Sequence, residues 1–339
     1  MEALLKNPNI KIRDIETVKE KFRQIQKGGK NDLMHVEFAI ESRAFENNVD
    51  SPRFQAFSIL NRPSVAGARQ PETNMRRVQI ISDFDYTITK FYKTVDSSYS
   101  NSHMIFDHHL QHTDMEEYLK VKKFNSRYLQ IEKTVDMTKE EKTTEMIKMF
   151  KATYQNIVDR KISKDDLEEI VKKADWVMKD RVKDFFETLA LGQIPIVLFS
   201  AGIVTVIEVF LRQQIPDALL SQTHTCGNRM LFDENNVCVG IKQPFIHCYN
   251  KGGAMLPKDD PYFHEYAIRQ NVVMFGDSLG DLTMHHGVER TGALLTVALC
   301  NYGDKPELVE KYEKLYDIVV VGDESFDVPI QIVEKVLKG

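Results

Sequence analysis

Few cysteines occur in this sequence, and their spacing matches no disulfide framework. There are four among 339 residues, and no two form a C-x-x-C pair. A disulfide-rich secreted domain is therefore excluded, and we expect reduced thiols in a reducing compartment. The four are Cys226, Cys238, Cys248 and Cys300.

Long apolar runs are also missing. The first thirty residues mix charged and apolar side chains, so we expect no signal peptide. The most hydrophobic stretch, 194–211, is interrupted by Pro195, Gly202 and Glu208, which favours a buried strand and a helix over a membrane span. We therefore expect a cytoplasmic protein without membrane contact.

Charge of one sign does not dominate, because 45 Lys and Arg residues face 50 Asp and Glu residues, for a formal net charge of −5. This balance gives no general attraction to a nucleic-acid polymer or an anionic membrane. Any phosphate group must therefore be bound by a local site.

Strand-like and helix-like segments alternate along the second half of the chain. Such alternation predicts an α/β fold with a doubly wound, mostly parallel sheet that helices cover on both faces. The apolar, strand-like runs are 78–82, 194–199, 271–275, 294–298 and 318–321.

Composition divides the chain into four predicted parts. Residues 1–29, with a helix over 15–26, form an N-terminal helical part of the core. Residues 30–74 lack a sustained hydrophobic period and contain three prolines, so we expect an insertion that is loop or disordered. Residues 75–93 and 185–339 form the core, and 94–184 form an inserted helical cap.

Two helices of the predicted cap carry N-terminal capping signals. Thr138 is followed three residues later by Glu141, and Ser163 is followed at the same spacing by Asp166. We expect a helix to begin directly after each hydroxyl residue.

Polar residues after apolar runs point to a ligand site, because doubly wound sheets bind ligands beyond the carboxyl ends of their strands. Asp83 and Asp85 directly follow the run 78–82, and their spacing of two directs both carboxylates to one side. Two such carboxylates repel each other unless a cation or a shared proton intervenes. A helix cap would explain one acid, but not two followed by Thr87.

Three further motifs are weaker evidence for a ligand site when each is taken alone. Ser200-Ala201-Gly202 could bind an anion at a helix start or simply cap that helix. Lys251 beside two glycines could offset phosphate charge or lie in a surface turn. The segment GDSLGD over 276–281 places two acids four residues apart, which suits magnesium coordination or a double helix cap.

The order of these four motifs resembles the signature of the haloacid dehalogenase superfamily. Within it the chain is similar to the cytosolic 5′-nucleotidase III family, also called pyrimidine 5′-nucleotidases. The resemblance covers about residues 5–29 and 77–338, and it rests on the segments IISDFDYTITKF, YLQIE, IPIVLFSAGI, FDENNVCVG, NKGGA and FGDSLGDL.

The resemblance implies a set of catalytic roles. Asp83 would attack phosphorus and form an aspartyl-phosphate, and Asp85 would protonate the leaving oxygen and then activate water. Mg²⁺ would be bound by Asp83, Asp277 and the backbone carbonyl of Asp85. Ser200, Ala201 and Lys251 would bind the phosphoryl oxygens. Asp281 and Thr87 would support these residues and the metal ligands without contacting the metal ion or the phosphoryl group themselves.

The resemblance also implies a substrate site on the cap. Glu132 would read the base, Thr153 would contact the base or ribose, and His103 and Phe106 are stacking candidates. Where the family has a Trp-rich stretch, this chain has the sequence KMFK at residues 148–151. The resemblance therefore does not determine which base the substrate carries.

The sequence therefore predicts a magnesium-dependent 5′-nucleotidase that hydrolyses nucleoside 5′-monophosphates, either pyrimidine nucleotides such as CMP and UMP or 7-methyl-GMP. The alternatives are a phosphatase of another small phosphomonoester and a non-catalytic nucleotide-binding module. We expect a monomer whose partner is its substrate.

Overall fold

A computed structural model describes residues 4, 6–27, 78–94, 97–133, 137–322 and 324–338, without the side chains of 127–133, 139 and 338. The predicted insertion at 30–74 lies outside the described residues. All four cysteines are free thiols.

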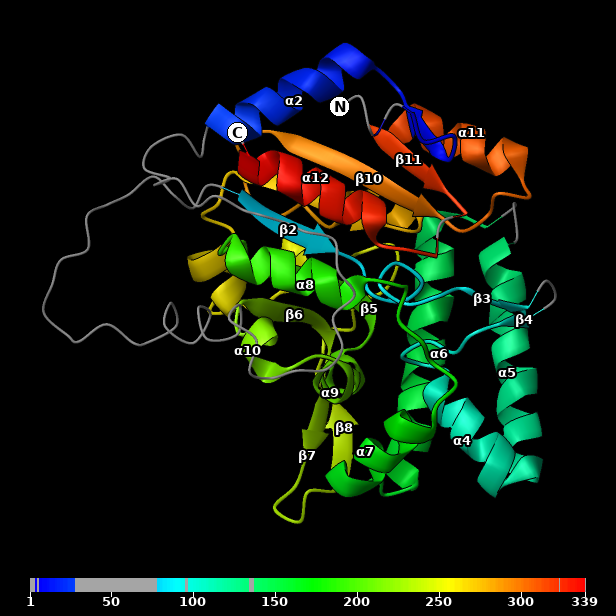
Figure 1. Cartoon of the computed structure of the whole chain (residues 1–339). Helices are drawn as coiled ribbons and strands as arrows, with labels where there is room; N and C mark the ends of the chain where they lie inside the picture. Colours follow the sequence, from blue (N-terminus) through cyan, green and yellow to red (C-terminus); the bar gives the residue numbers. More distant parts are fainter. Residues whose placement is uncertain are drawn as a thin grey trace, which may run out of the picture.

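The described strands build one large, mostly parallel sheet, as the sequence predicts. Its order is β1-β11-β10-β9-β2-β5-β6, and only the β1–β11 pair is antiparallel. Figure 1 shows the central strands side by side. In sheet order the strands are β1 (Ile10–Ile12), β11 (Ile318–Val321), β10 (Leu294–Cys300), β9 (Asn271–Gly276), β2 (Val78–Ser82), β5 (Ile196–Ile203) and β6 (Thr223–Asn228).

Successive residues of a strand point to opposite faces of the sheet, so a strand that is apolar throughout presents hydrophobic side chains on both faces. Other segments pack on each face and bury them. Ile80 and Val273 face the helices of one side, of which α8 and α12 lie in front of the sheet in Figure 1. On the other side of the sheet, Ile81 and Val272 face the segment around Tyr262. The covering helices are α2 (Ile15–Lys27), α8 (Val182–Leu191), α9 (Val204–Gln214), α12 (Asp327–Lys338) and, against β10 and β11, α11 (Pro306–Leu315).

A group of helices follows the first central strand, within the range predicted for a cap. Both predicted capping boxes are present, at Thr138 and Ser163. Figure 1 shows these helices grouped beside the sheet. They are α4 (Ile105–Thr113), α5 (Met115–Lys133), α6 (Lys139–Asp159) and α7 (Lys164–Lys173). The division into cap and core stays a prediction.

Short elements complete the described structure. Two small hairpins pair β3 (Tyr92–Thr94) with β4 (Ser97–Ser98) and β7 (Met230–Phe232) with β8 (Cys238–Ile241). The remaining helical turns are α10 (Asp217–Leu220), η1 (Gly253–Met255), η2 (Tyr262–Tyr266) and η3 (Leu279–Thr283).

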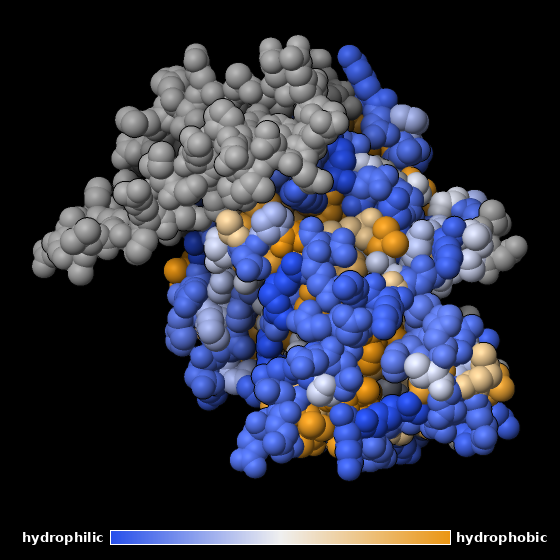
Figure 2. Space-filling view, turned by 60° about the horizontal axis from the view of Figure 1, so that its bottom comes forward, coloured by the Kyte–Doolittle hydropathy of each residue, from blue (hydrophilic) through white to orange (hydrophobic). Residues whose placement is uncertain are grey.

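The surface in Figure 2 is mainly hydrophilic, and its hydrophobic side chains gather in small separate areas. None of the helices in the described part of the chain has both the length and the apolar character needed to cross a membrane.

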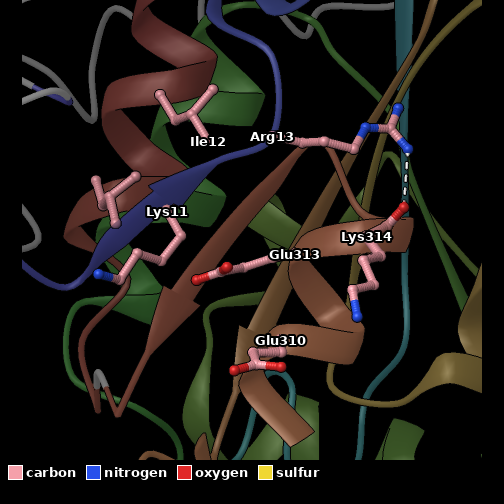
Figure 3. Close-up of a pocket in the computed structure, with 7 residues that line it drawn as sticks. Lys11, Ile12, Arg13, Glu310, Glu313 and Lys314 are labelled. Carbon is pink, nitrogen blue, oxygen red and sulfur yellow. Dashed lines mark hydrogen bonds between the residues drawn. The ribbon is translucent and has the colours of Figure 1, made fainter. Parts of the chain in front are cut away.

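The β1 edge of the sheet borders a charged hollow, shown in Figure 3. Residues of β1 and the following Arg13 form one wall, and α11 forms the other. Arg13 crosses between them and donates to the backbone carbonyl of Lys314 at 3.3 Å. No predicted site residue lines this hollow.

Candidate active site

Three adjacent strands bring the predicted motifs to one edge of the sheet. β2 lies between β9 and β5. Asp83 directly follows β2, Asp277 directly follows β9, and Ser200 lies near the end of β5. The backbone N–H of Asp83 donates to the carbonyl of Phe275 at 3.0 Å, which extends the β2–β9 pairing to the motif itself. The strands therefore fix the spacing of these side chains.

A buried ion cluster links two of the acids through Lys251. The ammonium donates to Oδ1 of Asp83 and, at 2.6 Å, to Oδ1 of Asp281. Thr87 Oγ1 donates to the other oxygen of Asp83 at 3.2 Å. Lys251 is only 5% exposed, so these contacts are shielded from water and from salt. Lys251 thus lies in the site and not in a surface turn.

Asp277 completes a cluster of three carboxylates. Oxygen atoms of Asp83, Asp277 and Asp281 all lie within 4.8 Å of one another. The turn that carries Asp277 is braced from α11, because Tyr312 donates to its backbone carbonyl at 2.6 Å. Asp281 also accepts from the backbone N–H and the hydroxyl of Ser278, each at 2.9 Å, so it caps η3 as well as binding Lys251.

The electrostatics of this cluster fit a divalent cation. Burial raises the pKa of Asp83 to about 7, against the opposing charge of Lys251. Burial, together with repulsion from Asp281 and Asp83, raises the pKa of Asp277 well above its usual range. The three carboxylates are opposed by Lys251 and, at Asp277, also by Lys179, and carboxylate oxygens are the donors that hard divalent cations prefer. The donor set therefore suits such an ion.

Asp85 lies outside this carboxylate cluster and is held by Ser102. The backbone N–H of Ser102 donates to Oδ1 of Asp85 at 2.9 Å, and its hydroxyl donates to Oδ2. Burial raises the pKa of Asp85 to about 6. Sequence reasoning missed Ser102, because nothing in the motif indicates a partner seventeen residues away.

The Ser200-Ala201-Gly202 segment differs from its predicted helix start. β5 continues through it to Ile203, with an irregular register against β6, and α9 begins only at Val204. Ser200 is buried and its Oγ accepts from the backbone N–H of Gly202 at 2.9 Å. The helix therefore starts close to where the sequence places it, but Ser200 does not cap it, because β5 continues past Ser200 and the N-cap position is Ile203.

The predicted base-side residues fall in different environments. His103 stacks on Phe150 of α6, with ring centroids 5.2 Å apart, and its Nε2 lies 3.1 Å from the carbonyl oxygen of Ala201. Thr153 is half-buried on α6. Phe106 is buried in the hydrophobic core. The Glu132 backbone belongs to α5, but its side chain lies outside the described residues.

Asn301 is a further residue that sequence reasoning missed. It directly follows β10, and its amide donates to the carbonyl of Tyr86 at 2.9 Å while its oxygen accepts from Lys179 at 3.1 Å. These bonds hold the loop after Asp85. The rule that strand ends carry functional groups could have found it, because the apolar run of β10 ends one residue earlier.

Comparison with known proteins identifies the family of this chain. The family model described as "Pyrimidine 5'-nucleotidase (UMPH-1)" matches residues 86–337. A Caenorhabditis elegans protein named as a cytosolic 5′-nucleotidase 3 is 37% identical over 256 residues, covering 75% of this chain and 68% of that protein. The 7-methylguanosine phosphate-specific 5′-nucleotidase A of Xenopus laevis is 34% identical over 259 residues, covering 74% and 85%.

A solved structure shares the fold. The crystal structure of cytosolic 5′-nucleotidase IIIB bound to cytidine superposes with a TM-score of 0.73 at 23% identity, covering 99% of this chain and 97% of that one. The strand-end cluster, the sequence relatives and the family match agree, and the chain belongs to the pyrimidine 5′-nucleotidase family of phosphoric monoester hydrolases.

Proposed function

We propose that this chain hydrolyses nucleoside 5′-monophosphates in the presence of Mg²⁺, through an aspartyl-phosphate on Asp83. The observation that carries the proposal is the buried cluster of Asp83, Lys251, Asp281 and Asp277 at adjoining strand ends. A nucleophile, a fixed positive charge and cation ligands in one place are what phosphoryl transfer needs.

The proposed cation site uses Asp83, Asp277 and the backbone carbonyl of Asp85. Mg²⁺ bound there would neutralise charge on the phosphoryl oxygens and on the carboxylates. Lys251 holds Asp83 in place and offers a second positive charge, while the Ser200 hydroxyl and the backbone of Ala201 contact the phosphoryl group.

Asp83 and Asp85 divide the bond changes between them. A carboxylate oxygen of Asp83 forms a bond to phosphorus as the bond to the 5′-oxygen breaks, and Asp85 gives its proton to that oxygen. Asp85 then takes a proton from water, whose oxygen attacks phosphorus and releases phosphate from Asp83. The pKa of Asp85, raised by burial to about 6, suits a group that alternates between acid and base.

The substrate class follows from the relatives' names and the cytidine-bound fold neighbour, which together favour a nucleotide over another phosphomonoester. Glu132 is proposed to read the base, and Thr153 and His103 to contact base or ribose. His103, with its ring on Phe150 and its Nε2 near the carbonyl oxygen of Ala201, lies between α6 and the proposed phosphate-binding end of β5.

Phosphate release from CMP, UMP, GMP and 7-methyl-GMP, with and without Mg²⁺, tests the activity. Asp83→Asn should lose at least about 10⁴-fold in kcat, the scale seen when a nucleophile is removed. Asp165→Asn is the matched control, because this acid is exposed on α7. Near-normal Mg²⁺-dependent turnover by Asp83→Asn would refute the mechanism, and tight nucleotide binding without any turnover would favour a non-catalytic module.

Two further measurements test the intermediate and the base. Acid quenching during turnover of labelled substrate should trap protein-bound phosphate that hydroxylamine releases, in the wild type but not in Asp83→Asn. Glu132→Ala should reduce discrimination among the four nucleotides and leave para-nitrophenyl phosphate hydrolysis intact. Equal losses on both kinds of substrate would contradict a base-reading role.

A further inference from the structure

A second group of metal-ligand side chains lies on the edge strand β6, separate from the carboxylate cluster. His224 and Cys226 are two residues apart on this strand, so their side chains share one face. Asp260, from the segment before η2, meets them there. One ligand atom from each of the three residues lies within 4.8 Å of the other two.

We propose that His224, Cys226 and Asp260 bind a divalent transition-metal ion, for which Zn²⁺ is the best match. Imidazole nitrogen, thiolate sulfur and carboxylate oxygen are the three donor types of protein zinc sites, whereas Mg²⁺ and Ca²⁺ prefer oxygen alone. Three protein ligands leave one tetrahedral position for water, and the partial exposure of His224 and Asp260 gives that water access.

The spacing of the ligand atoms of His224 and Asp260 requires only a small adjustment. His224 Nε2 lies 2.8 Å from Asp260 Oδ1. Two ligands that are each about 2.0 Å from a tetrahedral ion are about 3.3 Å apart, so this pair must open by about 0.5 Å. Rotation of the Asp260 carboxylate is enough to provide that opening.

Neighbouring elements hold these ligands in place before an ion binds. The backbone N–H of Tyr262 donates to Asp260 Oδ1 at 2.9 Å. The ring of Tyr266 stacks on the imidazole of His224, with centroids 4.9 Å apart and planes inclined by 19°. Cys226 is fixed by its strand and is only 2% exposed. Ligands that are held in this way lose little conformational entropy on metal binding.

The surrounding charges permit a cation. Arg229 directly follows β6 and acts electrostatically on Cys226 and Asp260, but Glu208 engages it through both carboxylate oxygens, at 2.8 and 2.7 Å. Lys242 also acts electrostatically on Asp260. In the absence of an ion the Cys226 thiol keeps its proton, because burial raises its pKa. Coordination displaces that proton to solvent as the sulfur–metal bond forms.

An ion at this place would join two segments that border Ser200 and Ala201, the proposed phosphate-binding residues. Cys226 pairs in register with Phe199, the residue before Ser200. Asp260 belongs to the segment that follows Lys251 and packs over the sheet. The ion would therefore stabilise the backbone beside the proposed phosphate site without contacting the substrate.

Equilibrium dialysis against Zn²⁺ in saturating Mg²⁺ tests the site, because Mg²⁺ occupies the oxygen-only cluster. The wild type should bind one Zn²⁺. His224→Ala and Asp260→Asn should each weaken Zn²⁺ binding more than about 100-fold, which exceeds the loss typical of residues that only support a metal ligand. His285→Ala is the control, because this histidine is also half-buried but lies outside the cluster.

Co²⁺ gives a second readout that does not depend on turnover. The Co²⁺-loaded wild type should show a thiolate-to-metal charge-transfer band, which Cys238→Ser retains and Cys226→Ser loses. Asp260→Asn changes a partly exposed side chain, so its binding result stands if Cys226→Ser fails to fold. Zn²⁺ affinities of His224→Ala and Asp260→Asn equal to that of the wild type, or a Co²⁺ spectrum without a thiolate band, would overturn the proposal.

Discussion

Gly202 lies where a side chain would collide with the group that holds Asp85. A Cβ atom at this position would lie 1.7 Å from Ser102 Oγ, 2.8 Å from Asp85 Oδ2 and 2.9 Å from Ser102 Cβ. Rotation of the Ser102 hydroxyl relieves the first contact but not the third. Gly202→Ala must therefore move the Ser102 backbone, which also donates to Asp85.

Gly202→Ala should reduce both the stability of the fold and the rate of turnover. Overpacking of a well-packed site costs about 1–3 kcal/mol of unfolding free energy. Misplacing a catalytic group by about 1 Å costs on the order of 100-fold in rate. We therefore expect Gly202→Ala to lower kcat for CMP about 100-fold and to lower the free energy of unfolding by about 1–3 kcal/mol.

Phosphate release and urea unfolding measure both effects, and two variants serve as controls. Gly240→Ala should change stability by less than about 0.5 kcal/mol, because nothing lies within 4 Å of its added methyl group. Ser102→Gly removes two of the three close atoms, those of Ser102 itself, so the pair Ser102→Gly and Gly202→Ala should show a favourable coupling of about 1 kcal/mol or more. Normal turnover and stability of Gly202→Ala alone would show that Ser102 does not position Asp85.

Two further predictions concern the stability of the predicted cap. Burial raises the pKa of Asp107 to about 6 from 3.8, so the folded state binds more protons between these values and stability falls as pH rises through them. In the wild type, this carboxyl should lower the unfolding free energy by about 1.4 kcal/mol between pH 5 and pH 8, and Asp107→Asn should abolish that contribution. Identical profiles of unfolding free energy against pH for the variant and the wild type would contradict this. Ser163→Ala should cost about 1 kcal/mol in urea unfolding, because it leaves the N–H of Asp166 without its cap. An unchanged midpoint would mean that the capping box contributes nothing to stability.

Most of the sheet could be predicted because its strands are strongly apolar and end in polar residues. Strands β2 and β11 have the predicted bounds, and β9 and β10 extend one or two residues beyond theirs. The hairpin of β7 and β8 and the three-residue β1 were missed, because elements this short carry no readable hydrophobic period. The bulge in β5 was missed for a different reason, since its register depends on the neighbouring strand.

The site was predictable only where its residues belong to motifs. Asp83, Asp277 and Asp281 follow strands or begin turns, and the structure brings them together with Lys251. Ser102 has no motif of its own, since its role depends on how the segment after β4 folds back over Asp85. His224 and Asp260 are 36 residues apart and meet only through tertiary packing.

His103 connects α6 to the end of β5, through its ring stack on Phe150 and its contact with the carbonyl of Ala201. Its chain neighbour is Ser102, whose two hydrogen bonds orient Asp85. A displacement of α6 away from the sheet would therefore be transmitted to Asp85, the proposed proton donor, through the adjacent residue Ser102. In the proposed mechanism, the position of α6 and the orientation of Asp85 are therefore coupled through two consecutive residues, His103 and Ser102.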